Sequence, residues 1–323
     1  MLTNSTRKIC IGTITRNRPV MLQKLLSSYE ALICPAASEL SFVIVENSDK
    51  KTLEPIVESF RKQVAPLDVI YKCEPVLGIA SARNRVLNYA IDHGYDLLTF
   101  ADDDEEVEPQ WLIELLKERD ASDLDIVGSP VRFATPESKL TLWQKIVWQG
   151  VNQVNQGAEA RALEIYKEGK ADRLKLATGS WLGNLSFFRS TGLRFDASLG
   201  QAGGEDWQLW QEAKDLGALT GWTPYAIAYE SIPVSRLKLN YYYRRNRDHT
   251  RMVYRERVKN GRAGRTFGSV LSRIYKVLVS TILLPFHRER GLLTIASNLG
   301  SLVGFIEGAR GKISMHYSEI DGH

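Results

Sequence analysis

The first half of the chain alternates short apolar runs with longer amphipathic runs, and this pattern limits the possible folds more than any other feature. Four strand-like runs, rich in β-branched and aromatic residues, are each followed by a run with helical spacing of its apolar residues. Such an alternation predicts a mixed, mostly parallel sheet flanked by helices. Ligands of these α/β folds bind beyond the carboxyl ends of the strands. The four strand-like runs are KICIGTI, SFVIVEN, LDVIYKC and DLLTFAD.

Beyond residue 125 the pattern becomes less regular. DIVGSPV predicts one more strand, and the run from Leu142 to Gly169 predicts one long helix or two helices joined by a loop. NLSFFR and AIAYES predict short strands on either side of a helix at DWQLWQEAKDLG. We therefore expect a catalytic α/β domain over residues 1–235 and a basic, helical region over residues 236–323.

The net charge of +4 hides a strong asymmetry. Between residues 236 and 265 there are eleven Lys and Arg against two acids, a local charge of +9, so the rest of the chain carries −5. A basic segment of this kind indicates an anionic partner, which is a phosphate group, a nucleic acid or an anionic membrane.

Two apolar stretches follow the basic segment, at residues 270–286 and 292–309. The first is interrupted by Arg273 and Lys276, and the second has about the minimum length for a span and contains Asn298. We interpret them as an amphipathic pair in the membrane interface; a re-entrant or spanning hairpin and a soluble helical cap are the alternatives. The N-terminus lacks the features of a secretory signal, so we expect the bulk of the protein in the cytoplasm.

Five consecutive acids, residues 102–106, follow the fourth strand-like run. Alternation along an extended chain would direct Asp102 and Asp104 to one side and Asp103 to the other. Two converging carboxylates repel each other unless a cation joins them, and Mg²⁺ and Mn²⁺ prefer oxygen ligands shared with a substrate phosphate. Glu105 and Glu106 are interpreted as charge at the start of the next helix. No Lys or Arg lies within the run, so we expect neutralising charge to arrive with the substrate.

FADDDEEVEPQWL resembles the DxD segment of family 2 glycosyltransferases, whose nucleotide-sugar-binding domain has the GT-A fold. Four further segments match in the expected order, and the resemblance covers about the first 240 residues. Three of them precede the acids: TITRNRP, VIVENSD and GIASARNRVLNYA. The fourth, GGEDWQLWQEAKDLG, follows them. The resemblance implies that the nucleotide sugar binds to residues in these segments: Thr15, Arg16, Asn17, Glu46, Arg83, Asn84, Asp102, Asp103 and Asp104.

Alternatives remain for two of these residues. Glu46 follows a strand and could cap the helix after it, and Arg83 could be a surface charge at helical spacing from an acid. Trp181 is either a platform for a sugar ring or a core residue.

On the acceptor side the resemblance implies that Asp206 is the catalytic base and that Glu205 binds or orients, with the reverse assignment left open. Glu230 stands where many relatives have a histidine near the metal. Glu230 is therefore a candidate third metal ligand beside Asp102 and Asp104, or a partner of Arg236 or Arg244.

The expected activity is inverting transfer of a sugar, assisted by Mn²⁺ or Mg²⁺, from a nucleoside diphosphate sugar to a glycan hydroxyl. The resemblance to transferases of bacterial exopolysaccharide assembly implies a UDP-sugar such as UDP-glucose and a polyprenyl-diphosphate-linked acceptor. It also implies action at the cytoplasmic face of the inner membrane, through the C-terminal region, and no nucleic-acid partner. The alternatives are an inactive membrane-bound scaffold and a sugar nucleotidyltransferase. TITRNRP has no glycine for a triphosphate loop, which disfavours the latter.

Overall fold

The computed structural model describes residues 6–176, 178–200, 204–259, 261 and 264–310. The chain divides into two compact units, which we describe separately. Among the described residues, the first contains residues 6–134 and Glu159–Ser231. The second contains Thr135–Ala158 and the described residues between 232 and 310. The sequence-based division at residues 235 and 236 falls four residues from the second of these boundaries, and it does not include residues 135–158 in the second unit.

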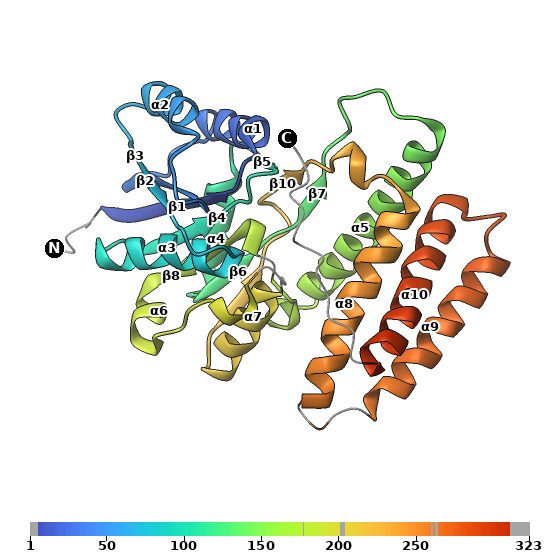
Figure 1. The fold of residues 1–323 in the computed structure, drawn as a ribbon. Coiled ribbons are helices and arrows are strands. Elements are labelled where there is room, and N and C mark those ends of the chain that lie inside the picture. The colour runs from blue at the N-terminus through green and yellow to red at the C-terminus, as the bar shows by residue number, and fades with distance from the viewer. Residues whose placement is uncertain (1–5, 177, 201–203, 260, 262–263, 311–323) are drawn as a thin grey trace. The chain divides into compact units, whose positions relative to one another are not determined.

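The first unit is built on a seven-stranded sheet (Figure 1). The strand order is β3-β2-β1-β4-β8-β6-β9, in which β8 runs antiparallel to both its neighbours and the other pairs are parallel. The sheet is thus mixed and mostly parallel, as predicted. The strands are β1 (Arg7–Thr15), β2 (Ser38–Glu46), β3 (Asp68–Cys73), β4 (Leu97–Phe100), β6 (Ile126–Gly128), β8 (Trp181–Asn184) and β9 (Thr220–Trp222).

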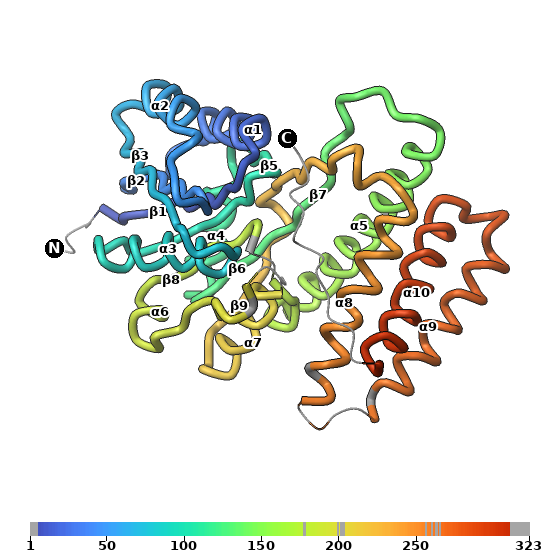
Figure 2. Tube along the Cα trace, viewed as in Figure 1, coloured from blue at the N-terminus to red at the C-terminus, as the bar shows by residue number. Residues whose placement is uncertain are grey.

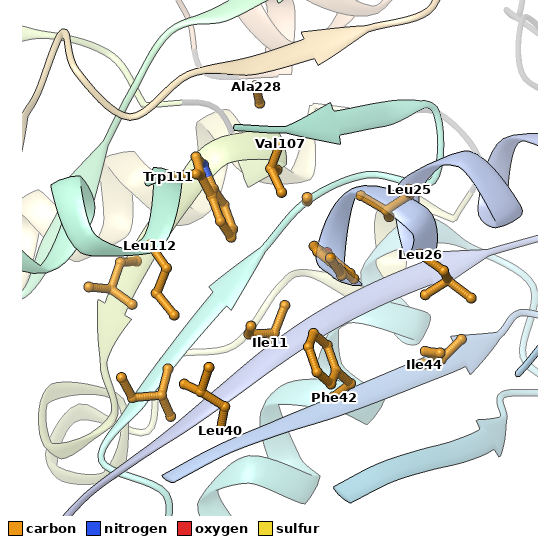
Figure 3. Packing of buried hydrophobic residues seen from close by; sticks show 14 of the residues in the cluster. Ile11, Leu25, Leu26, Leu40, Phe42, Ile44, Val107, Trp111, Leu112 and Ala228 are labelled. Atoms are coloured by element: carbon orange, nitrogen blue, oxygen red, sulfur yellow. The ribbon is translucent and has the colours of Figure 1, made fainter. Parts of the chain in front are cut away.

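Helices cover both faces of this sheet. Alternate residues of β1 point to opposite faces, so Ile9 and Ile11 join one core cluster and Cys10 the other. One cluster contains residues of α1, α2 and α4, and Figure 3 shows Phe42, Leu25 and Trp111 among its members. The other contains residues of α3, α6 and α7. The helices are α1 (Pro19–Glu30), α2 (Glu54–Gln63), α3 (Ile79–Asp92), α4 (Trp111–Ser122), α6 (Leu185–Thr191) and α7 (Glu205–Asp215).

A second, three-stranded sheet has the order β5-β10-β7. Its strands are β5 (Glu105–Val107), β7 (Val131–Phe133) and β10 (Ala228–Glu230). The single strand predicted at DIVGSPV is wrong in this respect, because Ser129 and Pro130 separate β6 in the large sheet from β7 in the small one. Pro130 has no N–H for a continued ladder, which favours a break at this point.

The strand predicted at NLSFFR is also wrong, since this segment forms helix α6 and the strand, β8, precedes it. Asn184 begins the helix as its N-cap, with its side-chain oxygen accepting from the N–H of Ser186 at 3.1 Å. Gly192 ends it in the left-handed conformation, φ 71°. A short apolar run does not by itself distinguish a strand from a buried helix.

The second unit consists of helices. In Figures 1 and 2, α10 lies between α8 and α9 and packs on both. The first part of α5 belongs to this unit, and α5 is one continuous helix, which decides between the two predicted forms. Of the described helices, one has the length and apolar composition to cross a membrane, and it is α10. The helices are α5 (Leu142–Lys167), α8 (Leu239–Lys259), α9 (Arg265–Ile282) and α10 (Arg288–Ala309).

Candidate active site

The acids that follow β4 form a turn instead of the start of a helix. The N–H of Glu105 donates to the carbonyl oxygen of Asp102 at 3.0 Å, and the chain then enters β5. Helix α4 begins only at Trp111. Glu105 is buried, and its carboxylate accepts from the N–H of Asp102 at 3.0 Å. The interpretation of Glu105 and Glu106 as charge at a helix start is therefore wrong. We call Asp102–Asp104 the acid turn.

Asp103, one of the residues predicted to bind the nucleotide sugar, is buried between the side chains of Thr15, the last residue of β1, and Arg18, just beyond it. Its carboxylate accepts from the Thr15 hydroxyl at 2.7 Å and from the Arg18 guanidinium at 2.8 Å. The same Arg18 nitrogen lies 3.2 Å from Asp104. Because the segment turns, Asp103 and Asp104 both contact the Arg18 guanidinium. The alternation expected of an extended strand therefore does not apply here.

Arg83, on α3, connects the acid turn to the start of α7. One guanidinium nitrogen donates to Asp102 at 2.8 Å, and the other terminal nitrogen donates to Glu205 at 2.5 Å. Arg83 is only 4% exposed, so it is not the surface charge that the sequence left open. Burial alone would lower the pKa of this guanidinium, but Asp102 and Glu205 raise it overall, so Arg83 stays charged.

The acids around these two arginines carry more negative charge than Arg18 and Arg83 compensate. Burial, Glu230 and Asp103 hold the pKa of Asp104 well above its usual range, although Arg18 opposes them. Burial and Asp102 raise the pKa of Glu105 in the same way. Part of the neutralising charge thus comes from distant parts of the chain, which corrects the expectation that it arrives only with the substrate. The remaining excess is the condition under which carboxylates bind a cation.

Glu230 lies beside the acid turn. It is the Cα partner of Glu105 where β10 pairs with β5, and the N–H of Ser231 donates to the Asp104 carbonyl oxygen at 2.7 Å. The small sheet therefore brings Glu230 close to Asp104, one of the predicted metal ligands.

The carboxylates of the acid turn fit a metal that is shared with a substrate. Within the described ranges, no three His, Cys, Asp or Glu side chains are already grouped as a metal site. Asp102 Oδ2 and Asp104 Oδ1 make no hydrogen bond to any residue in the part of the chain that the structure describes, so each leaves an oxygen for a cation. Mg²⁺ commonly has this arrangement, with one or two carboxylates and substrate phosphates as ligands.

The first turn of α7 presents two acids in different environments. Glu205 is buried, and burial raises its pKa while Arg83 lowers it. Asp206 is half-buried, and one of its oxygens accepts from the N–H of Trp207 at 2.7 Å. Gly204 enters the helix at φ 93°, whereas Gly203 lies outside the described residues.

The aromatic residue exposed near these acids is Trp207, which the sequence reasoning missed. Trp207 is 41% exposed and directly follows Asp206. Trp181 is 2% exposed and packs against Phe100 and Phe188, so it is a core residue and not a sugar platform.

The predicted nucleotide-binding residues at the ends of β1 and β2 differ in exposure and in whether their side chains already make hydrogen bonds within the protein. Arg16 is half-exposed and Asn17 is exposed at φ 52°, while the Thr15 hydroxyl is engaged with Asp103. Glu46 is 1% exposed and accepts from the Thr52 N–H at 2.8 Å and from the Tyr71 hydroxyl.

Asn84 is engaged with a backbone segment. Its side chain donates to the Phe195 carbonyl oxygen at 2.8 Å and accepts from the Phe195 N–H at 2.9 Å. The Phe195 ring lies 5.8 Å from the Arg83 guanidinium carbon. Asn84 therefore fixes a ring that packs on Arg83.

The family profile described as Glycosyl transferase family 2 matches residues 10–183, more than half of the chain. This range includes most of β1, all of α3 and the acid turn. The chain belongs to glycosyl transferase family 2. It is a glycosyltransferase, as the sequence predicted, and the family assignment disfavours a sugar nucleotidyltransferase.

A curated relative and several solved structures resemble this family 2 glycosyltransferase. The succinoglycan biosynthesis protein ExoM of Rhizobium meliloti is 29% identical over 248 residues, which cover 73% of this chain and 71% of ExoM. The mannosyltransferase PcManGT from Pyrobaculum calidifontis, solved with GDP-Man and Mn²⁺, has a TM-score of 0.63 at 13% identity, covering 96% and 89% of the two chains.

Residues 1–349 of TarS from S. aureus, solved with UDP, have a TM-score of 0.52 at 14% identity, covering 94% of this chain and 92% of that one. In a longer TarS structure the match, with a TM-score of 0.50 and 15% identity, covers 76% of this chain and 40% of TarS. These likenesses confirm the predicted GT-A fold.

Arg18, which pairs with Asp103 and Asp104, is a charged residue of the candidate site that was not predicted from the sequence. The signal was its position directly before Pro19, the first residue of α1, in the matched segment TITRNRP. A residue there lies at the carboxyl end of β1, where ligand-binding residues of such sheets gather.

Proposed function

We propose that this glycosyltransferase moves one sugar from a nucleoside diphosphate sugar to a hydroxyl of a glycan acceptor, with inversion at the anomeric carbon. The observation that carries the proposal is the Arg83 bridge between Asp102 and Glu205. Through this bridge, the acid turn, which would bind the cation of the leaving diphosphate, lies beside the start of α7, whose acids would bind and deprotonate the incoming hydroxyl. A single displacement needs both sets close together, one for each side of the reacting carbon.

Asp102 and Asp104, with Glu230 as a further oxygen donor, would hold the divalent cation, which is Mn²⁺ or Mg²⁺. When bound, the cation neutralises the charge that develops on the departing diphosphate. The free oxygens of Asp102 and Asp104 support this assignment, as does the Mn²⁺ in the PcManGT structure. Arg18 holds Asp103 and Asp104 in place, and Arg83 holds Asp102.

Asp206 would act as the general base. Its Oδ1 is oriented by the Trp207 N–H, and its Oδ2 makes no hydrogen bond to a described residue and can take the acceptor proton. Glu205 is held by Arg83 and would orient the acceptor side of the site. Trp207 offers an exposed ring on which a sugar of the acceptor can stack.

The nucleotide would bind at the carboxyl ends of β1 and β2. Thr15, Arg16 and Asn17 line the first of these ends, and Arg16 can pair with a phosphate. Glu46 would bind the base or ribose by exchanging one of its present donors, Thr52 or Tyr71. Asn84 would act through Phe195 on Arg83.

We propose a UDP-sugar such as UDP-glucose as donor and a polyprenyl-diphosphate-linked glycan as acceptor, in exopolysaccharide biosynthesis. The TarS structures with UDP and UDP-GlcNAc support the choice of donor, and the similarity to ExoM, a succinoglycan biosynthesis protein, supports a role in exopolysaccharide biosynthesis. The protein would act at the cytoplasmic face of the inner membrane, and its C-terminal helices would provide the membrane contact. No nucleic acid takes part.

The test of the reaction is the variant Asp206→Asn. We expect transfer to fall by about 10²–10⁴-fold, because the amide cannot take the acceptor proton. UDP binding in the presence of Mn²⁺ should remain close to wild type. Transfer is measured as nucleoside diphosphate release from UDP-glucose, UDP-GlcNAc and GDP-mannose, with membranes as the acceptor source.

Asp215→Asn, at the exposed end of the same helix, is the matched control and should be fully active. Near-normal transfer by Asp206→Asn would refute the assignment of the base. The product's anomeric configuration, determined by NMR, should be opposite to that of the donor.

A further inference from the structure

Helix α9 carries a row of exposed apolar side chains along one face. The spacing of four, three, one, three and four residues places them on the same side of the helix. They are between 42% and 74% exposed, and no described side chain of α9 is fully buried. We call this row the α9 face; it consists of Phe267, Leu271, Ile274, Tyr275, Leu278 and Ile282.

The α9 face continues past the end of the helix at Leu283 and Phe286, the latter 79% exposed. Contiguous apolar surface of this kind on a folded protein marks an interaction site. Phe267, Tyr275 and Phe286 place aromatic rings near both ends and in the middle, and aromatic side chains favour the boundary between water and lipid.

Helix α10, by contrast, packs closely on α8 through several of its buried glycines, although part of its surface is exposed. A Cβ added at Gly300 would lie 2.1 Å from the carbonyl oxygen of Tyr243, and one at Gly304 would lie 2.4 Å from that of Arg247. The backbones of α10 and α8 are therefore in direct contact. Helix α8 is strongly charged, so a bilayer could not replace α10's contact with it.

The polar side chains of α10 have partners within the unit. Glu307 pairs with Arg251, which also pairs with Asp248 at 3.0 Å. Asn298 accepts from Arg273 of α9 at 3.1 Å. Insertion of α10 across a bilayer would separate these pairs and leave charged groups in a low-dielectric medium.

The charge around the α9 face is positive. Between residues 255 and 290 the chain has nine Lys and Arg and two acids. Lys276, on α9, is exposed, and so are Arg288 and Arg290, which follow Phe286 directly. Positive charge flanking an exposed apolar helix face fits an anionic lipid surface, because Lys and Arg near such a surface are attracted to its negative charge.

We infer that α9 lies flat in the interface of an anionic phospholipid bilayer, with its apolar face toward the acyl chains, and that α10 does not span the membrane. The inference deepens the membrane contact in the proposed function and rests on it. It assigns the contact to one helix and makes the protein monotopic.

The experiment is flotation of the full-length protein with vesicles of phosphatidylcholine, alone or mixed equally with phosphatidylglycerol. The wild type should bind the anionic vesicles and release at high salt, because salt screens the basic groups. The double variant Leu271→Glu, Leu278→Glu should bind about tenfold less or weaker still. Val154→Glu, a partly exposed apolar position of α5 in the same unit, is the control and should bind normally.

Phe286→Glu, outside the regular helix, is a second variant that should also weaken binding without affecting folding. Equal binding to both kinds of vesicle, or binding that resists salt, would overturn the inference. Normal vesicle binding by the double variant would overturn the inference too. If the double variant lost self-association and kept vesicle binding, the α9 face would be a contact between copies of the chain, which would also overturn the inference. UDP binding with Mn²⁺, measured without lipid, tests the donor site separately.

Discussion

Arg83 is the residue of the candidate active site whose loss we expect to cost the most stability, because it is buried and pairs with two carboxylates. Replacement by methionine would leave Asp102 and Glu205 without their shared cation. Removing one partner of a buried ion pair costs about 3–5 kcal/mol. We therefore expect Arg83→Met to lower the free energy of unfolding by about that amount in urea titrations. The exposed Arg85→Met, on the same helix, should unfold like the wild type; equal losses for both would contradict the bridge.

The residues of the acid turn were predicted from the sequence, but their partners were not. Five consecutive acids directly after an apolar run are visible in the sequence itself. Arg18 and Arg83 are separated from the turn by 85 and 19 residues in the hydrogen bonds they make with it, so no local spacing reveals the pairing. The same holds for Glu46 and Asn84. Glu46 accepts a hydrogen bond from Tyr71, and Asn84 donates one to Phe195, and both partners are distant in the sequence.

At the level of elements, α10 depends on its glycines. Gly304 lies where a Cβ would meet the Arg247 carbonyl oxygen and the Thr250 side chain, at 2.4 and 2.8 Å. We expect Gly304→Ala to force α10 away from α8 and to lower the free energy of unfolding by about 1–3 kcal/mol.

Gly268→Ala in α9 is the control for Gly304→Ala, since nothing lies within 4 Å of its added Cβ. Alanine there should stabilise the helix by up to about 1 kcal/mol. Thermal unfolding of both variants checks the pair. A stable Gly304→Ala protein would show that the two helices are not in backbone contact.

The long elements of the first unit were predictable, and most of the three-residue strands were not; β10 is the exception, since AIAYES predicted it. Strands β1 and β2 have nine residues each and strong apolar patterns, so their place in a parallel sheet follows from periodicity. Strands β5, β6 and β7 have three residues each, too few to show a period. Their pairing is set by the tertiary fold, which is why β5 was mistaken for the start of a helix.

At the scale of the whole molecule, the charge asymmetry of the sequence corresponds to the two units. The acids of the candidate site belong to the first unit and the basic segment from residue 236 to the second. The membership of residues 135–158 in the second unit was not visible in the sequence. It depends on contacts such as that of Gly150 on α5 with Glu289 and Leu293, which join segments about 140 residues apart.

The central claim is that the acid turn holds a divalent cation together with a nucleoside diphosphate, and calorimetric titration tests it directly. UDP and GDP are titrated into wild type and Asp104→Ala, each with Mn²⁺ and with a chelator. We predict that Mn²⁺ increases the affinity of the wild type for at least one of the two nucleotides by about tenfold or more, and that Asp104→Ala loses this increase. Asp92→Ala, at the exposed end of α3, should keep it. Equal affinity with Mn²⁺ and chelator in the wild type, or an unchanged gain in Asp104→Ala, would contradict it.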